Sequence, residues 1–137
     1  MSPERMNILV VDDDEIDTES VRRLFRKRQM PVNLHVAKDG VEALAVIRGE
    51  GGYPCLKHPC MLLVDINMPR MNGLELLEAI REDPALRDLP VFILTTSDAA
   101  QDIQAANECA VEGYFLKGQD EDYLMQAIQS AMGVGAT

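Results

Sequence analysis

Polar side chains that can take part in chemistry stand at the ends of four separate apolar segments of this chain. Asp12 and Asp13 supply two adjacent carboxylates and Asp65 a third. Thr95 supplies a hydroxyl, and Lys117 supplies an ammonium. If the four segments are parallel strands of one sheet, their carboxyl ends lie along one edge, where ligands bind in open α/β sheets. We therefore expect these side chains to converge on one site.

The three carboxylates predict a metal site. Asp12, Asp13 and Asp65 would repel one another within a few ångströms unless a cation lay among them. Oxygen ligands that leave positions open for water and substrate favour Mg²⁺, which proteins hold with one or two carboxylates plus phosphate oxygens. The backbone carbonyl of Asn67, two residues beyond Asp65, is a further candidate ligand.

A carboxylate beside Mg²⁺ can act as a nucleophile, so Asp65 is predicted to attack a phosphoryl group and form an acyl phosphate. Lys117 and the metal would balance the phosphoryl charge, and the Thr95 hydroxyl would donate a hydrogen bond. The alternative is that residues 12–14 only cap the following helix, since acids favour helix starts, and that Lys117 is merely solvated. Placement after four separate strands favours the functional interpretation.

Strand-like apolar segments alternate with helical patterns along the chain, which is typical of repeated βα units and a parallel sheet. We expect strands at residues 7–11, 33–37, 61–65, 91–95 and 113–116, and helices at residues 15–29, 41–48, 73–81, 99–110 and 122–132. Pro31 is expected to end the first helix, and Asp39 to cap the second. Ile16, Leu24 and Phe25 are predicted to face the core from the first helix.

Length and charge limit the classes of function. The chain has 137 residues, which corresponds to one domain of ordinary size. Its formal net charge of -10 repels phosphate backbones and anionic membranes, so we expect no direct nucleic-acid binding. The apolar runs are too short to cross a membrane, and the first residues lack the apolar core of a secretion signal. These features predict a cytoplasmic protein without membrane contact.

The cysteines favour reduced thiols over a disulfide framework, because their number is odd and one of them, Cys109, lies in a helical pattern. Cys55 and Cys60 bracket His58 at the end of a loop rich in Gly and Pro, Gly49–Pro59. This segment lacks the second ligand pair of a structural zinc site, so we predict no zinc there.

Four stretches, LVVDDD, LLVDINMPRMNG, PVFILTT and GYFLK, follow one another in the order and spacing of a known family. By them the chain resembles the receiver domain of two-component response regulators from about Met6 to Met132. The resemblance implies one receiver domain over residues 1–137. It also implies a flavodoxin-like α/β fold, with a doubly wound five-stranded parallel sheet of order 2-1-3-4-5 and five helices.

The same resemblance assigns roles to individual residues. It implies that Asp65 is phosphorylated, that Lys117 pairs with the phosphoryl group, and that Thr95 and Tyr114 are the switch residues. It further implies that Asp12, Asp13, Asp65 and the Asn67 carbonyl hold Mg²⁺, with Asp13 as a direct ligand. A phosphohistidine on a sensor histidine kinase would be the phosphoryl donor.

Two departures from the common receiver pattern narrow the resemblance. Gly118 follows Lys117 where most receivers have proline, so the cis peptide usual there is in doubt. The loop at residues 49–59 is also long. With the TTS at residues 95–97, these traits resemble the single-domain regulators that work with phytochrome-type kinases.

The expected output is a change in protein contacts, since the chain ends at Thr137 with no output domain in view. Tyr123, Met125 and Met132 are predicted to lie off the inward stripe of the last helix, where they allow a homodimer through the fourth helix, fifth strand and fifth helix. The alternative is scattered surface apolar residues. The basic residues 22–28 are interpreted as a solvated helix face rather than a kinase dock.

Three other functions compete with a switching regulator. A shuttle or sink for phosphoryl groups in a phosphorelay would use the same residues. A haloacid-dehalogenase-like phosphotransferase would need a second Asp at position 67, which is Asn67 here. A receiver-like scaffold without phosphorylation is disfavoured because the acidic pair, Thr95 and Lys117 are all present.

Overall fold

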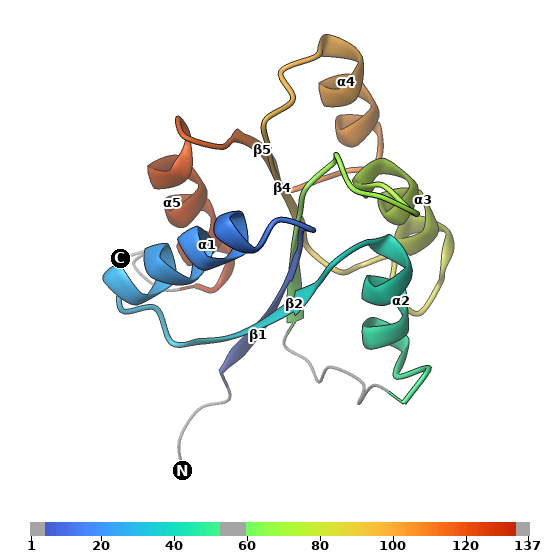
Figure 1. Cartoon of the computed structure of the whole chain (residues 1–137), viewed down its shortest axis with the longest axis horizontal. Helices are drawn as coiled ribbons and strands as arrows, with labels where there is room; N and C mark the ends of the chain where they lie inside the picture. The colour runs from blue at the N-terminus through green and yellow to red at the C-terminus, as the bar shows by residue number, and fades with distance from the viewer. Residues whose placement is uncertain (1–4, 53–59, 134–137) are drawn as a thin grey trace.

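The structure is a computed structural model that describes residues 5–52 and 60–133, and it contains one parallel sheet covered by helices on both faces (Figure 1). The strands are β1 Met6–Val11, β2 Val32–Ala37, β3 Cys60–Val64, β4 Val91–Thr95 and β5 Gly113–Leu116. The helices are α1 Glu15–Lys27, α2 Gly40–Arg48, α3 Gly73–Glu82, α4 Ala100–Glu108 and α5 Glu121–Ala131. The strand order β2-β1-β3-β4-β5 confirms the predicted doubly wound fold.

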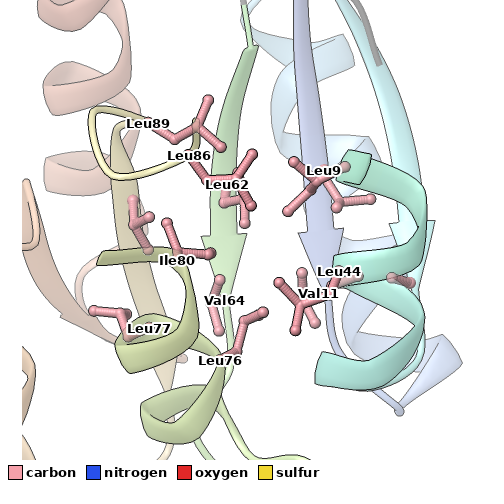
Figure 2. Close-up of a cluster of buried hydrophobic side chains, with 14 of the residues drawn as sticks. Leu9, Val11, Leu44, Leu62, Val64, Leu76, Leu77, Ile80, Leu86 and Leu89 are labelled. Atoms are coloured by element: carbon pink, nitrogen blue, oxygen red, sulfur yellow. The ribbon is translucent and has the colours of Figure 1, made fainter. Parts of the chain in front are cut away.

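Both faces of the sheet are buried because successive strand residues point to opposite sides and each side carries helices. Leu9 and Val11 of β1 point into the cluster beneath α2 and α3 that Figure 2 shows. Ile8 and Val10 pack in a second cluster, with side chains of α1 and α5. Figure 1 shows this division, with α1 and α5 on one side and α2, α3 and α4 on the other.

The strand register places the polar strand ends side by side. Val11 of β1 pairs with Val64 of β3, so Asp12 and Asp65 leave the sheet at the same level. Thr95 of β4 pairs with Leu116 of β5, the residue before Lys117. The sheet therefore delivers all four strand ends to one edge.

Helix caps explain several sequence choices near that edge. Asp14 is the N-cap of α1 and accepts hydrogen bonds from the backbone of Ile16 and Asp17. The capping interpretation of the acidic run is therefore right for Asp14. Asp39 caps α2, as predicted, and Asn72 begins α3 with a reciprocal capping box to Glu75.

Two predicted side-chain orientations are wrong. Ile16 is 77% exposed, because at about 100° per residue it lies on the side of α1 opposite Thr18, which is buried. Met125 is fully buried together with Leu124 and Ile128, because the inward stripe of α5 is wider than the sequence pattern indicated.

The first predicted helix is also too long, because α1 ends at Lys27 and Gln29 takes a left-handed φ of 52°. Among the described residues, no helix is long and apolar enough to cross a membrane. Cys109 has a free thiol, and Cys60 is buried at the start of β3. Cys55 and His58 lie outside the described residues.

Candidate functional site

The predicted carboxylates meet at the carboxyl edge of the sheet. Asp12 and Asp65 are buried, with 6% and 7% of their surface exposed, whereas Asp13 faces solvent. One carboxylate oxygen from each of the three lies within 4.8 Å of the others. The chain thus builds a compact anionic cluster open to solvent on the Asp13 side.

Lys117 reaches into this cluster from the end of β5. Its Nζ donates hydrogen bonds to Oδ2 of Asp12 at 2.8 Å, of Asp17 at 2.7 Å and of Asp65 at 3.0 Å. Burial opposes the ammonium charge, but these three hydrogen bonds outweigh it and raise the pKa of Lys117 above its ordinary value. Lys117 is therefore cationic throughout the physiological pH range.

The Asp12 carboxylate is not fully balanced by this lysine. Burial raises the pKa of Asp12, and the hydrogen bonds from Lys117 and the Asp14 N–H only partly offset that effect. Repulsion from Asp65 acts in the same direction as burial. A divalent cation fits this arrangement, because the donors are all hard oxygens and the cluster has excess negative charge.

Asn67 lies beside the cluster in the loop after β3. Its backbone N–H donates to Oδ1 of Asp65 at 3.3 Å, and its side chain is exposed. It lines a cleft of about 370 Å³ together with residues of the β1–α1 loop, of its own loop, of α3 and of α4, namely Asp13, Ile66, Met68, Pro69, Asn72, Leu74 and Asp102. The cleft gives a phosphoryl donor room to approach from the Asp13 side.

The backbone around Asp65 is closely packed. The Asp65 N–H donates to Val11 O at 2.9 Å, and the Gly73 N–H donates to Ile66 O at 3.0 Å. A Cβ on Gly73 would lie 2.4 Å from Asp65 O and 2.9 Å from Ile66 Cα. Only glycine allows the start of α3 to approach the Asp65 backbone so closely.

Thr95 at the end of β4 and Tyr114 in β5 both contact Ser97 in the loop between β4 and α4. Thr95 is fully buried, and its Oγ1 accepts a hydrogen bond from the Ser97 N–H at 3.3 Å. The Tyr114 hydroxyl donates to the Ser97 carbonyl at 2.8 Å, while the Ser97 hydroxyl donates to Asp102 Oδ2 at 2.6 Å. Burial raises the pKa of Tyr114. The two predicted switch residues are therefore joined through Ser97.

The departure at Gly118 has a structural reason. Gly118 has a φ of 80°, a left-handed conformation that proline cannot adopt, and its N–H donates to the Glu121 carboxylate. A proline at this position would lose both the conformation and the donor. The backbone conformation at Gly118 therefore differs from the one that a proline would impose.

The structure brings the side chains of Asp12, Asp13, Asp65 and Lys117 together. It also shows three contacting side chains to which the sequence analysis gave no role. Asp17 binds Lys117, and Ser97 and Asp102 connect the β4–α4 loop to Tyr114. The sequence signal for Asp17 is weak, because an acid in the first turn of a helix is common for electrostatic reasons alone. Ser97 entered the sequence analysis only as part of the TTS at residues 95–97, without a role in the site, and Asp102 carried no signal because ordinary helix starts contain the same residue type.

Comparison with known proteins shows related chains of the same architecture. Response regulator Rcp1 of Synechocystis sp. is 31% identical over 122 residues, which cover 89% of this chain and 83% of Rcp1. Its Mn²⁺-bound crystal structure has a TM-score of 0.81 at 30% identity and covers 96% of both chains. The likeness therefore extends over nearly the whole chain.

Two further solved structures are similar to this chain. The bacteriophytochrome response regulator AtBRR has a TM-score of 0.83 at 32% identity, with 98% of this chain and 97% of AtBRR covered. The phosphorylated cyanobacterial phytochrome response regulator RcpA has a TM-score of 0.80 at 30% identity, with 93% and 91% covered. Residues 8–129 match the model of the response regulator receiver domain, and the chain belongs to that family.

Proposed function

We propose that this chain is a response regulator that accepts a phosphoryl group from a sensor histidine kinase on Asp65. The observation that carries the proposal is the position of the Asp65 carboxylate, which lies between an acidic pair and a lysine at the open edge of the sheet. A buried carboxylate that contacts a fixed cation and lies beside two further carboxylates, which can hold a divalent ion, is arranged for phosphoryl transfer. Membership of the receiver family supports the same function.

The chemistry follows from the positions of the side chains. A carboxylate oxygen of Asp65 attacks the phosphorus, the P–N bond to the donor histidine breaks, and its electron pair stays on the imidazole. The Lys117 ammonium stabilises the negative charge on the phosphoryl oxygens and keeps its own proton. The protein promotes this step only on itself.

Asp12, Asp13, Asp65 and the backbone carbonyl of Asn67 would hold Mg²⁺, with Asp13 as a direct ligand. When bound, the ion supplies positive charge next to the phosphoryl oxygens. The compact cluster of carboxylate oxygens supports this assignment. The Mn²⁺ in the solved Rcp1 structure shows that a related protein takes a divalent ion.

The output of phosphorylation is a shift between two conformations. The phosphoryl group adds about -1.5 to -2 charges at neutral pH, and the Thr95 hydroxyl would move towards it. That movement would break the contact between Thr95 and Ser97, to which the Tyr114 hydroxyl is tied. Tyr114 would then rotate into the vacated space and alter the surface of α4, β5 and α5.

Mass spectrometry after incubation with acetyl phosphate and Mg²⁺ tests the phosphoacceptor. We expect one added phosphoryl group on the wild type and none on Asp65→Asn, because an amide is a poor nucleophile. Asp98→Asn is a matched control, since this exposed acid stands in the neighbouring β4–α4 loop and should leave labelling unchanged. Equal labelling of Asp65→Asn and wild type would reject the assignment.

We infer that the donor is a phytochrome-type kinase. The support is the likeness to AtBRR and RcpA, which are both described as phytochrome response regulators. Phosphotransfer profiling against a set of purified histidine kinases tests the inference. Preferential transfer from kinases with phytochrome input domains is expected, and a clear preference for another class would contradict it.

A homodimer through α4, β5 and α5 is part of the same proposal. Tyr123 of α5 is 67% exposed and can contribute apolar contact, whereas Met125 cannot because it is buried. Sedimentation with and without beryllofluoride, a phosphoryl mimic, tests this part. We expect the dimer to become more populated with the mimic and less so in Tyr123→Ser, and unchanged sedimentation would count against it.

A further inference from the structure

Asp17 is the one Lys117 partner that does not come from a strand end. It lies in the first turn of α1 and contributes the shortest of the three contacts, at 2.7 Å. Asp12 and Asp65 approach the ammonium from the floor of the site, with side chains 6% and 8% exposed, whereas the Asp17 side chain is 36% exposed. The lysine is thus fixed from two directions, the sheet edge and the helix above it.

We infer that Asp17 is a positioning residue for phosphoryl transfer, which it promotes by holding the Lys117 ammonium over Asp65. The inference rests on the proposed function. An ammonium on a flexible four-carbon stem has three N–H donors, and here each has a carboxylate acceptor. With Asp12 and Asp17 holding two of them, the third donor is directed at Asp65.

The contacts of Asp12 and Asp17 with Lys117 can also position the ammonium after Asp65 is phosphorylated. When an Asp65 oxygen bonds to phosphorus, the N–H that pointed at Asp65 is next to the new phosphoryl oxygens. The contacts to Asp12 and Asp17 need not break, so the ammonium is in place before and after transfer. Positioning of this kind lowers the barrier because no reorganisation is needed when the charge develops.

The simpler explanation of Asp17 is an acid in the first turn of a helix, where it interacts favourably with the helix dipole. The cap of α1 does not need its side chain, because Asp14 Oδ1 accepts from the backbone N–H groups of Ile16 and Asp17. The Asp17 carboxylate instead reaches Lys117, whose side chain is only 13% exposed. A pair with one buried partner is screened less than an ordinary surface ion pair.

The test compares the rate of acetyl phosphate labelling of wild type and Asp17→Asn, each in the Lys117 and the Lys117→Met background. We expect Asp17→Asn to slow labelling about fivefold when Lys117 is present, because the Asn oxygen can still accept a hydrogen bond but lacks the negative charge that strengthens it. In the Lys117→Met background we expect no further slowing of the residual rate, because Asp17 then has nothing to position. A merely structural role would slow both backgrounds alike.

Glu15→Gln is the matched control for charge. Glu15 lies in the same helical turn and is exposed, and its replacement changes the net charge by the same amount. Its labelling rate should equal that of the wild type. Circular dichroism and urea unfolding establish that both variants are folded.

Four results would overturn the inference. They are an unchanged rate in Asp17→Asn, a faster rate, equal slowing in both Lys117 backgrounds, or equal changes in Glu15→Gln and Asp17→Asn. The last would mean that only the overall charge matters. Failure of the wild type itself to label would reject the proposed function, and the inference with it, so the two failures are distinguishable.

Discussion

The substitution Asp12→Asn should have opposite effects on stability with and without Mg²⁺. Oxygens of Asp12 and Asp65 lie within 4.8 Å of each other, and at that upper limit repulsion between the carboxylates costs about 3.5 kcal/mol for an effective dielectric constant of about 20. Attraction to Lys117 at 2.8 Å contributes about 6 kcal/mol, but burying the Asp12 ion costs several kcal/mol. The raised pKa of Asp12 shows that the unfavourable contributions are larger.

Removing this charge should therefore stabilise the metal-free protein. The Asn side chain keeps an oxygen acceptor for the Lys117 ammonium, which also retains Asp17 and Asp65. We expect the free energy of unfolding of Asp12→Asn in EDTA to exceed that of the wild type by about 1 kcal/mol, since the opposing contributions nearly cancel.

Magnesium should reverse the order of the two proteins in free energy of unfolding. A ligand at a hundred times its dissociation constant stabilises the folded state by about 2.7 kcal/mol. The wild type should gain this amount, whereas Asp12→Asn, with one carboxylate fewer, should gain little. The wild type then becomes the more stable protein.

Urea unfolding of both proteins, in EDTA and in excess Mg²⁺, measures the four free energies. Asp14→Asn is the control, because Asp14 is an exposed N-cap and Asn caps helices equally well. The free energy of unfolding of Asp14→Asn in EDTA should lie within about 0.5 kcal/mol of the wild-type value. Mg²⁺ should stabilise this variant as much as it stabilises the wild type. A less stable Asp12→Asn in EDTA, or an equal gain from Mg²⁺ in both proteins, would refute the reasoning.

Three further predictions concern Lys117, Arg81 and Gly73. The raised pKa of Lys117 means that its contribution to stability is complete below its ordinary value of 10.5 and is lost as the pH rises through the higher folded value. The difference in unfolding free energy between wild type and Lys117→Met should thus be constant from neutral pH to 10.5, and a decline below 10.5 would contradict the assignment. Arg81 donates hydrogen bonds to the carbonyls of Arg87, Leu89, Cys109 and Ala110, so Arg81→Ala should cost about 2 to 4 kcal/mol in urea unfolding. Arg81→Lys should recover only part of this free energy of unfolding, because one ammonium cannot replace the planar guanidinium. Full recovery would show that the geometry of the guanidinium does not matter. Gly73→Ala should destabilise the protein by about 3 kcal/mol and slow labelling, because the added Cβ displaces the Asp65 backbone, and an unaltered labelling rate would show that the close contact does not matter.

The fold was predictable because its signals are local and repeated. Five apolar segments alternate with helical patterns, and the central strands β3 and β4 are buried on both faces, so their sequences are continuous runs of apolar residues. The site followed from the same signals, since the residue after each such strand must lie at one edge. Asp12, Asp65 and Lys117 were therefore identified before any contact was known.

The errors and omissions come from features that local sequence does not determine. The apolar character of Ile16 predicts a place in the core, whereas the phase of α1 leaves this side chain in solvent. Met125 was assigned to the surface because the buried width of a helix depends on what packs against it. The Asp17 contact with Lys117 joins residues 100 positions apart, and the Ser97 links depend on how a loop closes. Such contacts are set by tertiary packing.

The most direct test of the account is to locate the phosphoryl group on the labelled protein. After reaction with acetyl phosphate and Mg²⁺, peptide mapping by mass spectrometry should place the phosphoryl group on Asp65 in the segment after β3. The same reaction in EDTA should leave that segment unmodified. A stable phosphoryl group on any other residue, or labelling of Asp65 that is equally fast without a divalent ion, would contradict the central claim.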